Sequence, residues 1–575
     1  LGSVDMIVTD KTGTLTENTM TVQRILFSGD VYEVTGSGTS TEGGFHRDGE
    51  RVEPPELEPV LKCGLYCNNA ERAPEEEEED YFGDPTEVAL LVSAEKAGIE
   101  IEGERLREIP FSSDRARMTT IHDEGGERTA YMKGAPETVL DRCDRVLEGG
   151  EAVELTEGKR EEILGRNEQF AGDALRVLGF AMKEVDEADA ASGEIESGMV
   201  FLGLQGMIDP PREEVPEAVE DCRDAGIGVV MVTGDNIETA KAVGEEVGFD
   251  PEGAMTGREV EELSDDELEE KVEDVEVFAR VSPSEKVRIL QALQSNGYTV
   301  AMTGDGVNDA PAVKNADVGI SMGERGTDVT EQSSDMVLLD DNFATIRNAI
   351  AEGRGIFDNI RKFVSYLLSY NAGEVLLVFL GILVGSWLFP SVFQTGGEEA
   401  VVLTPVMLLW INLVTDGLPA LALGADPKVP GIMERPPRGK EESVINKRMI
   451  ATILGIGVAM TATILPFFFL ILPGLQLAQT FAFTALVLFE MIGIQAIRKQ
   501  FGMEMFTNIW LWAAILATVV LQAAVLYTPL NRFFEVVPLG VSMWEEIAIS
   551  LVAFLVLVAG LLKLEESFLG QETGS

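Results

Sequence analysis

Apolar residues are distributed unevenly along the chain and divide it into two parts. Residues 1–360 mix short apolar runs with polar segments, whereas residues 361–565 are mostly apolar. The apolar part contains six stretches of roughly 18–25 residues, each long enough to cross about 30 Å of hydrocarbon. They are 363–388, 401–424, 448–473, 479–497, 507–527 and 545–563. The pattern therefore predicts a soluble region followed by an all-α transmembrane region of six helices.

Three apolar runs in the soluble region have the pattern of buried parallel strands, and each leads to an aspartate. Residues 4–8 lead to Asp10, residues 227–232 to Asp235, and residues 299–302 to Asp305. The carboxyl ends of parallel strands are where open α/β sheets bind ligands. Carboxylates that meet at one edge repel one another, and Mg²⁺ with phosphate oxygens would relieve that repulsion. Asp10 alone could be a nucleophile for phosphoryl transfer or a residue that caps a turn.

Longer motifs favour the nucleophile. Residues 10–16 (DKTGTLT) resemble the phosphorylation motif of P-type ATPases, which are ion pumps that form an aspartyl phosphate. Four further motifs follow in the order of that family, including residues 233–235 (TGD) and 303–309 (TGDGVND). The resemblance covers essentially all 575 residues. It implies an enzyme that couples ATP hydrolysis to cation transport.

The resemblance also implies a multidomain fold. We expect an α/β haloacid-dehalogenase-type phosphorylation domain, an inserted α+β nucleotide-binding domain, and a transmembrane region of six helices. The expected bounds are 1–21 and 203–345 for the phosphorylation domain, 22–202 for the insert, 346–362 for a stalk, 363–565 for the transmembrane helices, and 566–575 for a tail.

Roles for the phosphorylation site follow from the resemblance. It implies that Asp10 is the nucleophile and that Mg²⁺ is bound by Asp305, the Asp10 carboxylate and the Thr12 carbonyl. Lys286 would neutralise phosphoryl charge. The remaining expected site residues are Thr233 and Asn308, which would hydrogen-bond the phosphoryl group, Asp309 behind them, and Gly234, Asp235 and Asp209 in shared roles.

The insert would bind ATP. By position in the family motifs, Phe111 would stack on adenine and Lys133 would approach the nucleotide, with Glu87 and Arg176 lining the pocket. An aromatic ring with a nearby cation suits a planar base that carries phosphates. Composition alone does not mark this region, because a lone Phe or Lys is more often a core or surface residue.

Polar side chains inside the apolar stretches indicate a cation site. Three carboxylates and several neutral oxygens occur there, and they suit a hard cation, although hydrogen bonds between helices would explain single residues. The segments resemble the ion-binding spans of type II pumps such as the animal reticulum calcium-transporting ATPase. This implies one Ca²⁺ site from Asn371, Glu374, Thr415, Asp416 and Glu490, and a second with Asn412 and Asp416. Gly417 and Pro419 are expected to unwind the second span.

Charge and cysteine content indicate what the protein does not bind and where in the cell it lies. The formal charge of −54 argues against nucleic acid as a partner, because a nucleic-acid-binding face needs Lys and Arg. Lys and Arg gather in the loops 425–447 and 498–506, so we expect a multi-pass protein of the cell membrane with its soluble domains in the cytoplasm. The four cysteines fit reduced, buried thiols of a cytosolic domain.

The chain also departs from the family pattern. It has no Thr-Gly-Glu motif of an actuator domain and lacks the first four family spans. We therefore expect a fragment, or half of a split pump whose partner chain carries those parts, and no transport by the isolated chain. Two alternatives stay open: a pump for Na⁺ or another monovalent cation, and a non-pumping membrane regulator that binds nucleotide or Ca²⁺.

The acidic excess leads to the first testable prediction, that the protein comes from a halophile. Ninety-eight acidic residues against 44 basic ones repel one another in dilute buffer, and salt screens that repulsion. The melting temperature should therefore rise steeply between dilute buffer and molar KCl. A melting temperature that stays flat over this range would instead indicate acidic loops that are solvated locally.

Overall fold

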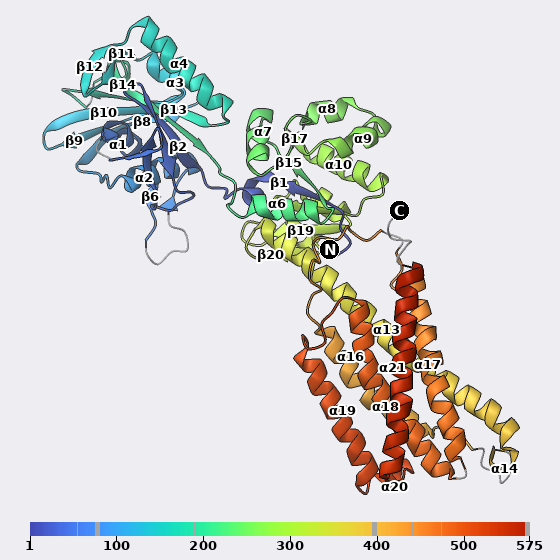
Figure 1. The fold of residues 1–575 in the computed structure, drawn as a ribbon. Coiled ribbons are helices and arrows are strands. Elements are labelled where there is room, and N and C mark those ends of the chain that lie inside the picture. The colour runs from blue at the N-terminus through green and yellow to red at the C-terminus, as the bar shows by residue number, and fades with distance from the viewer. Residues whose placement is uncertain are drawn as a thin grey trace. The chain divides into compact units, whose positions relative to one another are not determined.

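The computed structural model describes residues 1–53, 56–74, 81–188, 190–393, 400–439, 442–472 and 474–569. The chain forms two compact units, one of residues 4–347 and one of residues 1–3 with 348–575. The first is a mixed α/β unit, and the second contains the six long apolar helices (Figure 1). Each unit is described by itself below.

The α/β unit contains a seven-stranded sheet in which every pairing is parallel. The strand order is β16 (Met255–Thr256), β17 (Val277–Ala279), β15 (Gly228–Val232), β1 (Met6–Asp10), β18 (Val300–Gly304), β19 (Val318–Met322) and β20 (Met336–Leu338). Val8, Val230 and Met302 are buried in one apolar core with residues of the flanking helices. Burial on both faces is why these strands have nearly continuous apolar sequences.

Helices connect the parallel strands: α6 (Val215–Asp224), α7 (Ile237–Glu246), α8 (Gly257–Glu262), α9 (Asp265–Lys271), α10 (Pro283–Ser295), α11 (Ala310–Asn315) and α12 (Asp328–Ser333). The short 3₁₀ helix η3 (Val272–Asp274) follows α9. The start of α10 is set by a capping box between Ser282 and Glu285, with Pro283 in the first turn. This cap places Lys286 in the first turn of α10, where its side chain is buried.

A second sheet of eleven strands is inserted after β1. Its main order is β5 (Glu50–Val52), β4 (Gly44–Arg47), β3 (Asp30–Thr35), β2 (Thr21–Phe27), β14 (Met199–Ile208), β13 (Arg176–Glu184), β10 (Glu127–Gly134), β9 (Arg117–Glu124) and β8 (Glu104–Ser112). The strands β11 (Cys143–Glu148) and β12 (Glu151–Glu154) extend it beside β14. A separate hairpin pairs β6 (Glu71–Arg72) with β7 (Tyr81–Phe82).

Helices pack on both faces of this sheet. Alternate strand residues point to opposite faces, so Tyr131 belongs to the core with α1 (Glu58–Tyr66) and α2 (Pro85–Lys96). Met132 belongs to the core with α3 (Pro136–Leu140) and α4 (Glu157–Gly172). The short helix α5 (Ser192–Ile195) precedes β14. The expected domain boundary between residues 202 and 203 falls inside β14, which pairs with β2 through Ile208.

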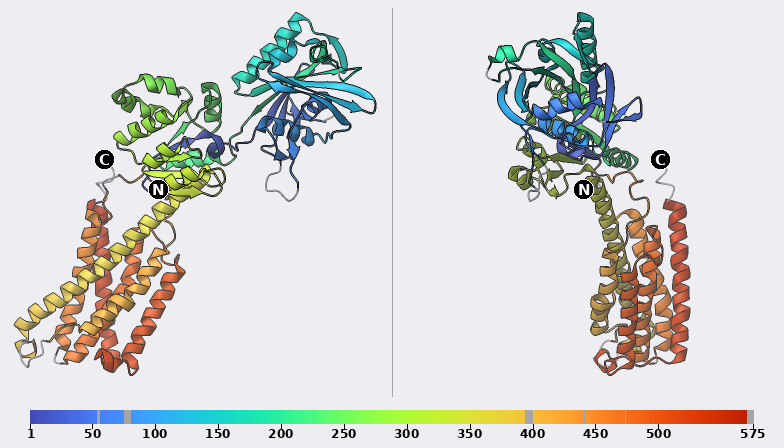
Figure 2. Two further views of the ribbon diagram at one scale, coloured as in Figure 1. Left: turned by 180° about the vertical axis from the view of Figure 1, so that it is seen from behind. Right: turned by 90° about the vertical axis from the view of Figure 1, so that its left-hand side faces the viewer.

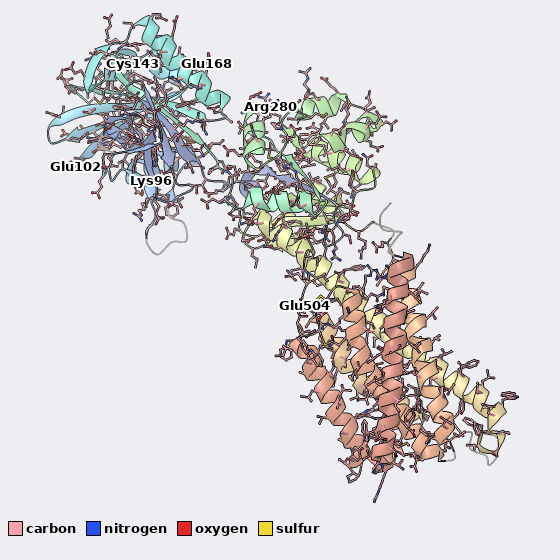
Figure 3. All side chains as sticks on the ribbon, in the orientation of Figure 1. Lys96, Glu102, Cys143, Glu168, Arg280 and Glu504 are labelled. Carbon is pink, nitrogen blue, oxygen red and sulfur yellow. The ribbon has the colours of Figure 1, made fainter. Side chains whose placement is uncertain are left out.

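The four cysteines are free and buried, as the composition predicted, and Figure 3 marks Cys143 in the inserted sheet. Cys63 and Cys67 lie on and just after α1, where their thiols face carbonyl oxygens of neighbouring strands. Burial raises the pKa of Cys67 above its usual value. These thiols are therefore core groups.

The helical unit confirms the six predicted spans. Its long helices are α13 (Phe343–Leu388), α17 (Lys447–Ile471), α18 (Leu475–Gln500), α19 (Ile509–Tyr527) and α21 (Val541–Leu569), and the second span comprises α15 (Pro405–Trp410), η4 (Ile411–Thr415) and α16 (Gly417–Gly424). The short helices α14 (Pro390–Phe393) and α20 (Asn531–Phe534) lie in connections. The expected tail 566–575 is helical to Leu569, and its remainder lies outside the described residues.

The long helices pack side by side as a bundle (Figure 2). Helix α18 is the most enclosed of the six spans, with 78% of its most apolar segment buried, so it forms the centre of the bundle. Small residues allow close approach: a Cβ on Gly493 of α18 would collide with the Tyr370 hydroxyl of α13. Gly493 follows Glu490 by less than one turn, so this contact holds α13 against the part of α18 that carries that carboxylate.

The prediction that Gly417 and Pro419 unwind the second span is wrong in position. Residues 417–424 are helical, and the irregular turn lies earlier, in the π-helix η4. There the N–H of Asp416 donates to the Ile411 carbonyl, five residues back. Pro419 falls in the first turn of α16, where a residue without an N–H group is tolerated. The widened turn carries Thr415 and directs it and Asp416 toward the bundle interior, where both are buried.

Candidate active site and cation site

Asp10 is held at the carboxyl end of β1 by three contacts. Its Oδ1 accepts from the Lys11 N–H at 2.7 Å, and its Oδ2 accepts from the Lys286 ammonium at 2.7 Å. Its own N–H donates to the Thr303 hydroxyl of the neighbouring strand β18 at 3.0 Å. The chain then turns through residues 11–15, with Gly13 at a positive φ of 77° that favours glycine. These contacts fix the Asp10 carboxylate at the sheet edge, beside the positively charged Lys286 ammonium.

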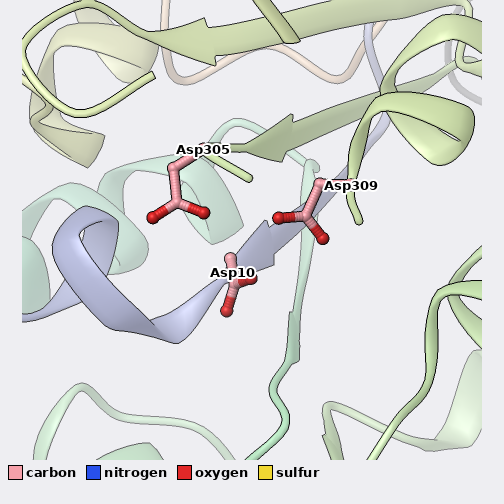
Figure 4. A group of neighbouring side chains, drawn as sticks. All are labelled: Asp10, Asp305 and Asp309. Atoms are coloured by element: carbon pink, nitrogen blue, oxygen red, sulfur yellow. The ribbon is translucent and has the colours of Figure 1, made fainter. Parts of the chain in front are cut away.

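Asp305 and Asp309, from the segment after β18, complete a cluster of three carboxylates (Figure 4). One oxygen of each lies within 4.8 Å of the others. Lys286 contacts Asp10 and also Asp309, at 2.7 Å. Among the residues that the structure describes, Asp305 makes no ion pair, whereas Asp10 and Asp309 share the Lys286 ammonium.

The electrostatics of the cluster favour a bound cation. Burial raises the pKa of Asp10 above its usual value, although the Lys286 ammonium opposes this. Burial together with the charges of Asp10 and Asp309 raises the pKa of Asp305 to about 6. Burial would lower the pKa of Lys286, but the two carboxylates outweigh it and keep the pKa above its usual value. Carboxylate oxygens in this arrangement are the donor set that Mg²⁺ prefers, so the residues fit that ion.

A second ion group supports the turn that follows Asp10. The Lys11 ammonium lies 2.8 Å from Asp235 and 3.7 Å from Asp209. Asp209 also accepts from the Thr16 hydroxyl at 2.5 Å and from the Thr19 N–H at 3.1 Å. Asp209 therefore holds the motif turn in place, a role that sequence reasoning missed because it depends on a residue almost 200 positions away.

The other expected residues of this site lie at the same sheet edge. Thr233 is buried at the end of β15, and its hydroxyl accepts from the Asp235 N–H at 3.2 Å. Gly234 and Asn308 are exposed in the loops after β15 and β18. The parallel order β15–β1–β18 brings these two loops to either side of Asp10.

A cleft of about 740 Å³ lies beside the motif turn in the same unit. Its lining includes Lys11 and Asp235 from the parallel-sheet region and Thr86 and Arg176 from the insert. Thr12 and Asp209 also line it. The cleft therefore offers cationic and neutral donors close to Asp10, as a phosphate chain would require.

The expected nucleotide residues come from several elements of the insert. Lys133 on β10 pairs with Glu87 on α2, Nζ to Oε1, at 2.6 Å. Phe111 on β8 has 61% of its surface exposed, which is unusual for so large an apolar side chain. Arg176, at the start of β13, lines the cleft instead. The structure thus joins Glu87 to Lys133, and it places Arg176 on the cleft that also contains Lys11.

The helical unit contains a second cluster of three carboxylates. Glu374 on α13, Asp416 between η4 and α16, and Glu490 on α18 each place an oxygen within 4.8 Å of the others. All three side chains are buried, with at most 4% of their surface exposed. Within the described part of the chain, each keeps one buried oxygen without a hydrogen-bond partner: Glu374 Oε1, Asp416 Oδ2 and Glu490 Oε1. Such unpaired oxygens are costly in an apolar interior unless a cation binds them.

Neutral groups orient these carboxylates. The Asn412 amide donates to Glu374 at 3.0 Å, and the Thr415 hydroxyl donates to Glu490 at 3.3 Å. The Asn371 amide donates instead to the Leu367 carbonyl of its own helix. Sequence reasoning missed Tyr366, whose hydroxyl donates to Asp416 at 3.1 Å. Its position two helical turns before Glu374 on the same face could have indicated it.

Comparisons with known proteins find relatives of both the soluble part and the apolar part of the chain. Residues 56–214 match a family described as "P-type ATPase, cytoplasmic domain N", and residues 400–564 match "Cation transporting ATPase, C-terminus". The chain is 40% identical over 564 residues to a calcium-transporting ATPase of Bacillus subtilis (strain 168), covering 95% of this chain and 62% of that protein. It is 39% identical over 592 residues to the cation-transporting ATPase pma1 of a Synechocystis strain, covering 97% and 63%. The chain thus spans about three fifths of the length of these curated relatives.

Proposed function

Because the chain belongs to the P-type ATPase family, whose similar members include cation-transporting ATPases, we propose that it drives Ca²⁺ transport through an aspartyl phosphate on Asp10. It is a multi-pass membrane protein with six apolar helices and cytoplasmic soluble domains. The observation that carries the proposal is that carboxylates form two clusters in separate units, a partly buried one around Asp10 and a fully buried one around Asp416. A phosphoryl-transfer site and a cation site in one chain are what an ion pump requires.

The proposed reaction begins with ATP in the cleft beside the motif turn. An oxygen of Asp10 attacks the γ-phosphorus, a new O–P bond forms, and the bond to the bridging oxygen of ADP breaks. Lys286, already 2.7 Å from Asp10, offsets charge on the phosphoryl oxygens. Thr233 and Asn308 donate hydrogen bonds to the same oxygens. Mg²⁺, for which Asp10, Asp305 and the Thr12 carbonyl are the proposed ligands, would neutralise the remaining negative charge.

We also propose that the parallel sheet is a haloacid-dehalogenase-type core. The support is its topology, in which β15, β1 and β18 lie side by side and each delivers a carboxylate to one edge. Asp10 on the central strand then reacts, while the loops after β15 and β18 supply the groups that bind phosphate and metal. The insert leaves this edge directly after the motif turn and returns through β14.

The nucleotide site of the insert gives the second testable prediction. Phe111→Ala should weaken ATP binding about fivefold or more, because a base–aromatic stacking contact contributes roughly 1–3 kcal/mol. Lys133→Ala should weaken it as well, because it removes the expected cation beside the nucleotide. Phosphorylation of Asp10 by inorganic phosphate should persist, since neither residue contacts Asp10. Titration of a fluorescent ATP analogue measures the affinities. Leu106→Ala, which removes another exposed apolar side chain of β8, is the control, and unchanged affinity in both test variants would remove them from the pocket.

The cargo is proposed to be Ca²⁺ because of the number of carboxylates. Ca²⁺ binds six to eight oxygens in irregular geometry. Glu374, Asp416 and Glu490 with their neutral neighbours provide most of such a shell. A Na⁺ site would leave more negative charge uncompensated in the bundle interior. A non-pumping regulator is disfavoured because it would not need Asp10, Lys286 and Asp305 arranged for phosphoryl transfer.

The test of this function is the phosphoenzyme. Given [γ-³²P]ATP and Mg²⁺, the whole protein in membranes should form an acid-stable, hydroxylamine-labile phosphoprotein when micromolar Ca²⁺ is added. Hydroxylamine cleaves acyl phosphates and leaves phosphoserine intact, so it identifies the linkage. A label that resists hydroxylamine, or one that forms equally in a Ca²⁺ chelator, would refute the proposal.

A further inference from the structure

A group of buried charges lies in the helical unit outside the cation site. Asp426, just after α16, pairs with the Lys362 ammonium at 2.9 Å and with the Arg498 guanidinium at 2.9 Å. All three side chains are at most 1% exposed. One carboxylate therefore holds two cations in an interior where an unpaired charge is strongly destabilising.

Neutral side chains complete the group. Asn508, at the start of α19, donates to Asp426 Oδ1 at 2.9 Å and to the Ala422 carbonyl at 2.8 Å. On α13, the Asn359 side chain accepts from Lys362 at 3.0 Å and donates to the Asp426 carbonyl at 2.8 Å. The segment after α16 is therefore bonded to its neighbours through both side chain and backbone.

The three charged residues lie on or directly beside the helices α13, α16 and α18, as the cation-site carboxylates do. Each of them is separated along the chain from one cation-site carboxylate. On α13, Lys362 lies 12 residues before Glu374, and on α18, Arg498 lies 8 residues after Glu490. Asp426 lies 10 residues after Asp416. At 1.5 Å per helical residue these separations are roughly 12–18 Å. Asp426 is thus too far from the cluster to touch a bound cation.

Resting on the proposed function, we infer that Asp426 is a positioning residue for the cation site. Its ion pairs and hydrogen bonds connect α13, α16 and α18 at one depth of the bundle. This connection fixes how far the helices are shifted along one another, and therefore how Glu374, Asp416 and Glu490 meet at a different depth. The need for such a tie is electrostatic. When no cation is bound, no positive charge lies between the three acidic side chains to hold their helices together, and the ion pairs of Asp426 provide that connection.

Two single variants test the inference in the whole protein. Lys362→Met removes the ion pair to α13 and leaves Asp426 and Arg498 as a neutral pair, so the fold should be retained. Asp426→Asn removes all the ion pairs. Both should raise the Ca²⁺ concentration for half-maximal ⁴⁵Ca²⁺ binding about tenfold, because the carboxylates then meet in a less well fixed geometry. Phosphorylation of Asp10 by inorganic phosphate should stay at the wild-type level.

A double variant and a control distinguish loss of positioning at the cation site from destabilisation by buried, unpaired charges. Asp426→Asn with Lys362→Met restores the net charge of the group and leaves only Arg498 without its ion pair, so it should recover part of the thermal stability lost in Asp426→Asn but keep the raised Ca²⁺ requirement. The control is Glu565→Gln on α21, a buried carboxylate bonded to Thr452 and Gln500 without contact to α13 or α16 in the described hydrogen bonds. Its Ca²⁺ requirement should match that of the wild type.

Three results would overturn the inference. They are an unchanged Ca²⁺ requirement in both single variants, a wild-type requirement in the double variant, and a loss of phosphorylation from inorganic phosphate in parallel with Ca²⁺ binding. The last would show that the charges serve folding alone. A wild-type protein without Ca²⁺-dependent phosphorylation would contradict the proposed function instead, so the two failures are distinguishable.

Discussion

Replacing Asp10 by asparagine should reduce phosphoenzyme formation from ATP to background. The amide has nearly the same shape and can still accept a hydrogen bond from the Lys11 N–H, which now donates to the carboxylate at 2.7 Å. It is not a nucleophile that can form an acyl phosphate. Nucleotide binding should persist, because the expected contacts to the base come from the insert. The measurements are ³²P labelling from ATP and nucleotide affinity in the same membranes.

A matched control separates chemistry from charge removal. Asp317 precedes β19, at the opposite edge of the same parallel sheet, and accepts from the Val300 N–H at 2.9 Å. Asp317→Asn should therefore label like the wild type. If Asp10→Asn still labelled at the wild-type level, Asp10 would not be the nucleophile.

The second large effect concerns the cation site. Asp416→Asn should raise the Ca²⁺ concentration needed for phosphorylation from ATP about a hundredfold, since losing one charge of a buried group costs about 3 kcal/mol. Glu374→Gln should act in the same direction. Phosphorylation by inorganic phosphate should survive in both variants, because the Asp10 site lies in the other unit. Phosphoenzyme level against free Ca²⁺ concentration measures the shift.

The control for this prediction is another carboxylate of the helical unit. Asp358 on α13 pairs with Arg435 at 2.9 Å and makes no ion pair with the cation cluster among the described residues. Asp358→Asn should leave the Ca²⁺ requirement within about twofold. A similar shift in Asp358→Asn and Asp416→Asn would mean that the cluster is not the binding site.

Local sequence patterns were enough to single out most of the carboxylates that the structure brings together in the two clusters. Asp10 and Asp305 could be recognised because each follows an apolar run that only a buried strand explains, and parallel strands share one ligand-binding edge. Glu374, Asp416 and Glu490 could be recognised because a carboxylate inside an apolar helix is costly without a partner. In both cases a charged residue interrupts or ends a run of apolar residues, and that interruption can be seen in the sequence.

Contacts between distant segments were not predictable in the same way. The ion pairs of Asp426 join residues more than 60 positions apart, and Asp426 itself follows a helix end where an aspartate is ordinary. Asp209 has the same character, because only the fold brings it to Thr16. The turn near Gly417 was misplaced for a related reason: Pro419 can enter the first turn of a helix without breaking it, and the irregularity was absorbed at residues 411–415.

The most direct test of the account is ATP-driven ⁴⁵Ca²⁺ uptake into inside-out membrane vesicles that contain the whole protein. The soluble domains then face the ATP in the medium. We predict Ca²⁺ accumulation that requires ATP and Mg²⁺, and that is absent in vesicles with Asp10→Asn. ATP-driven ²²Na⁺ uptake in the presence of a Ca²⁺ chelator, without ⁴⁵Ca²⁺ uptake, would contradict the account.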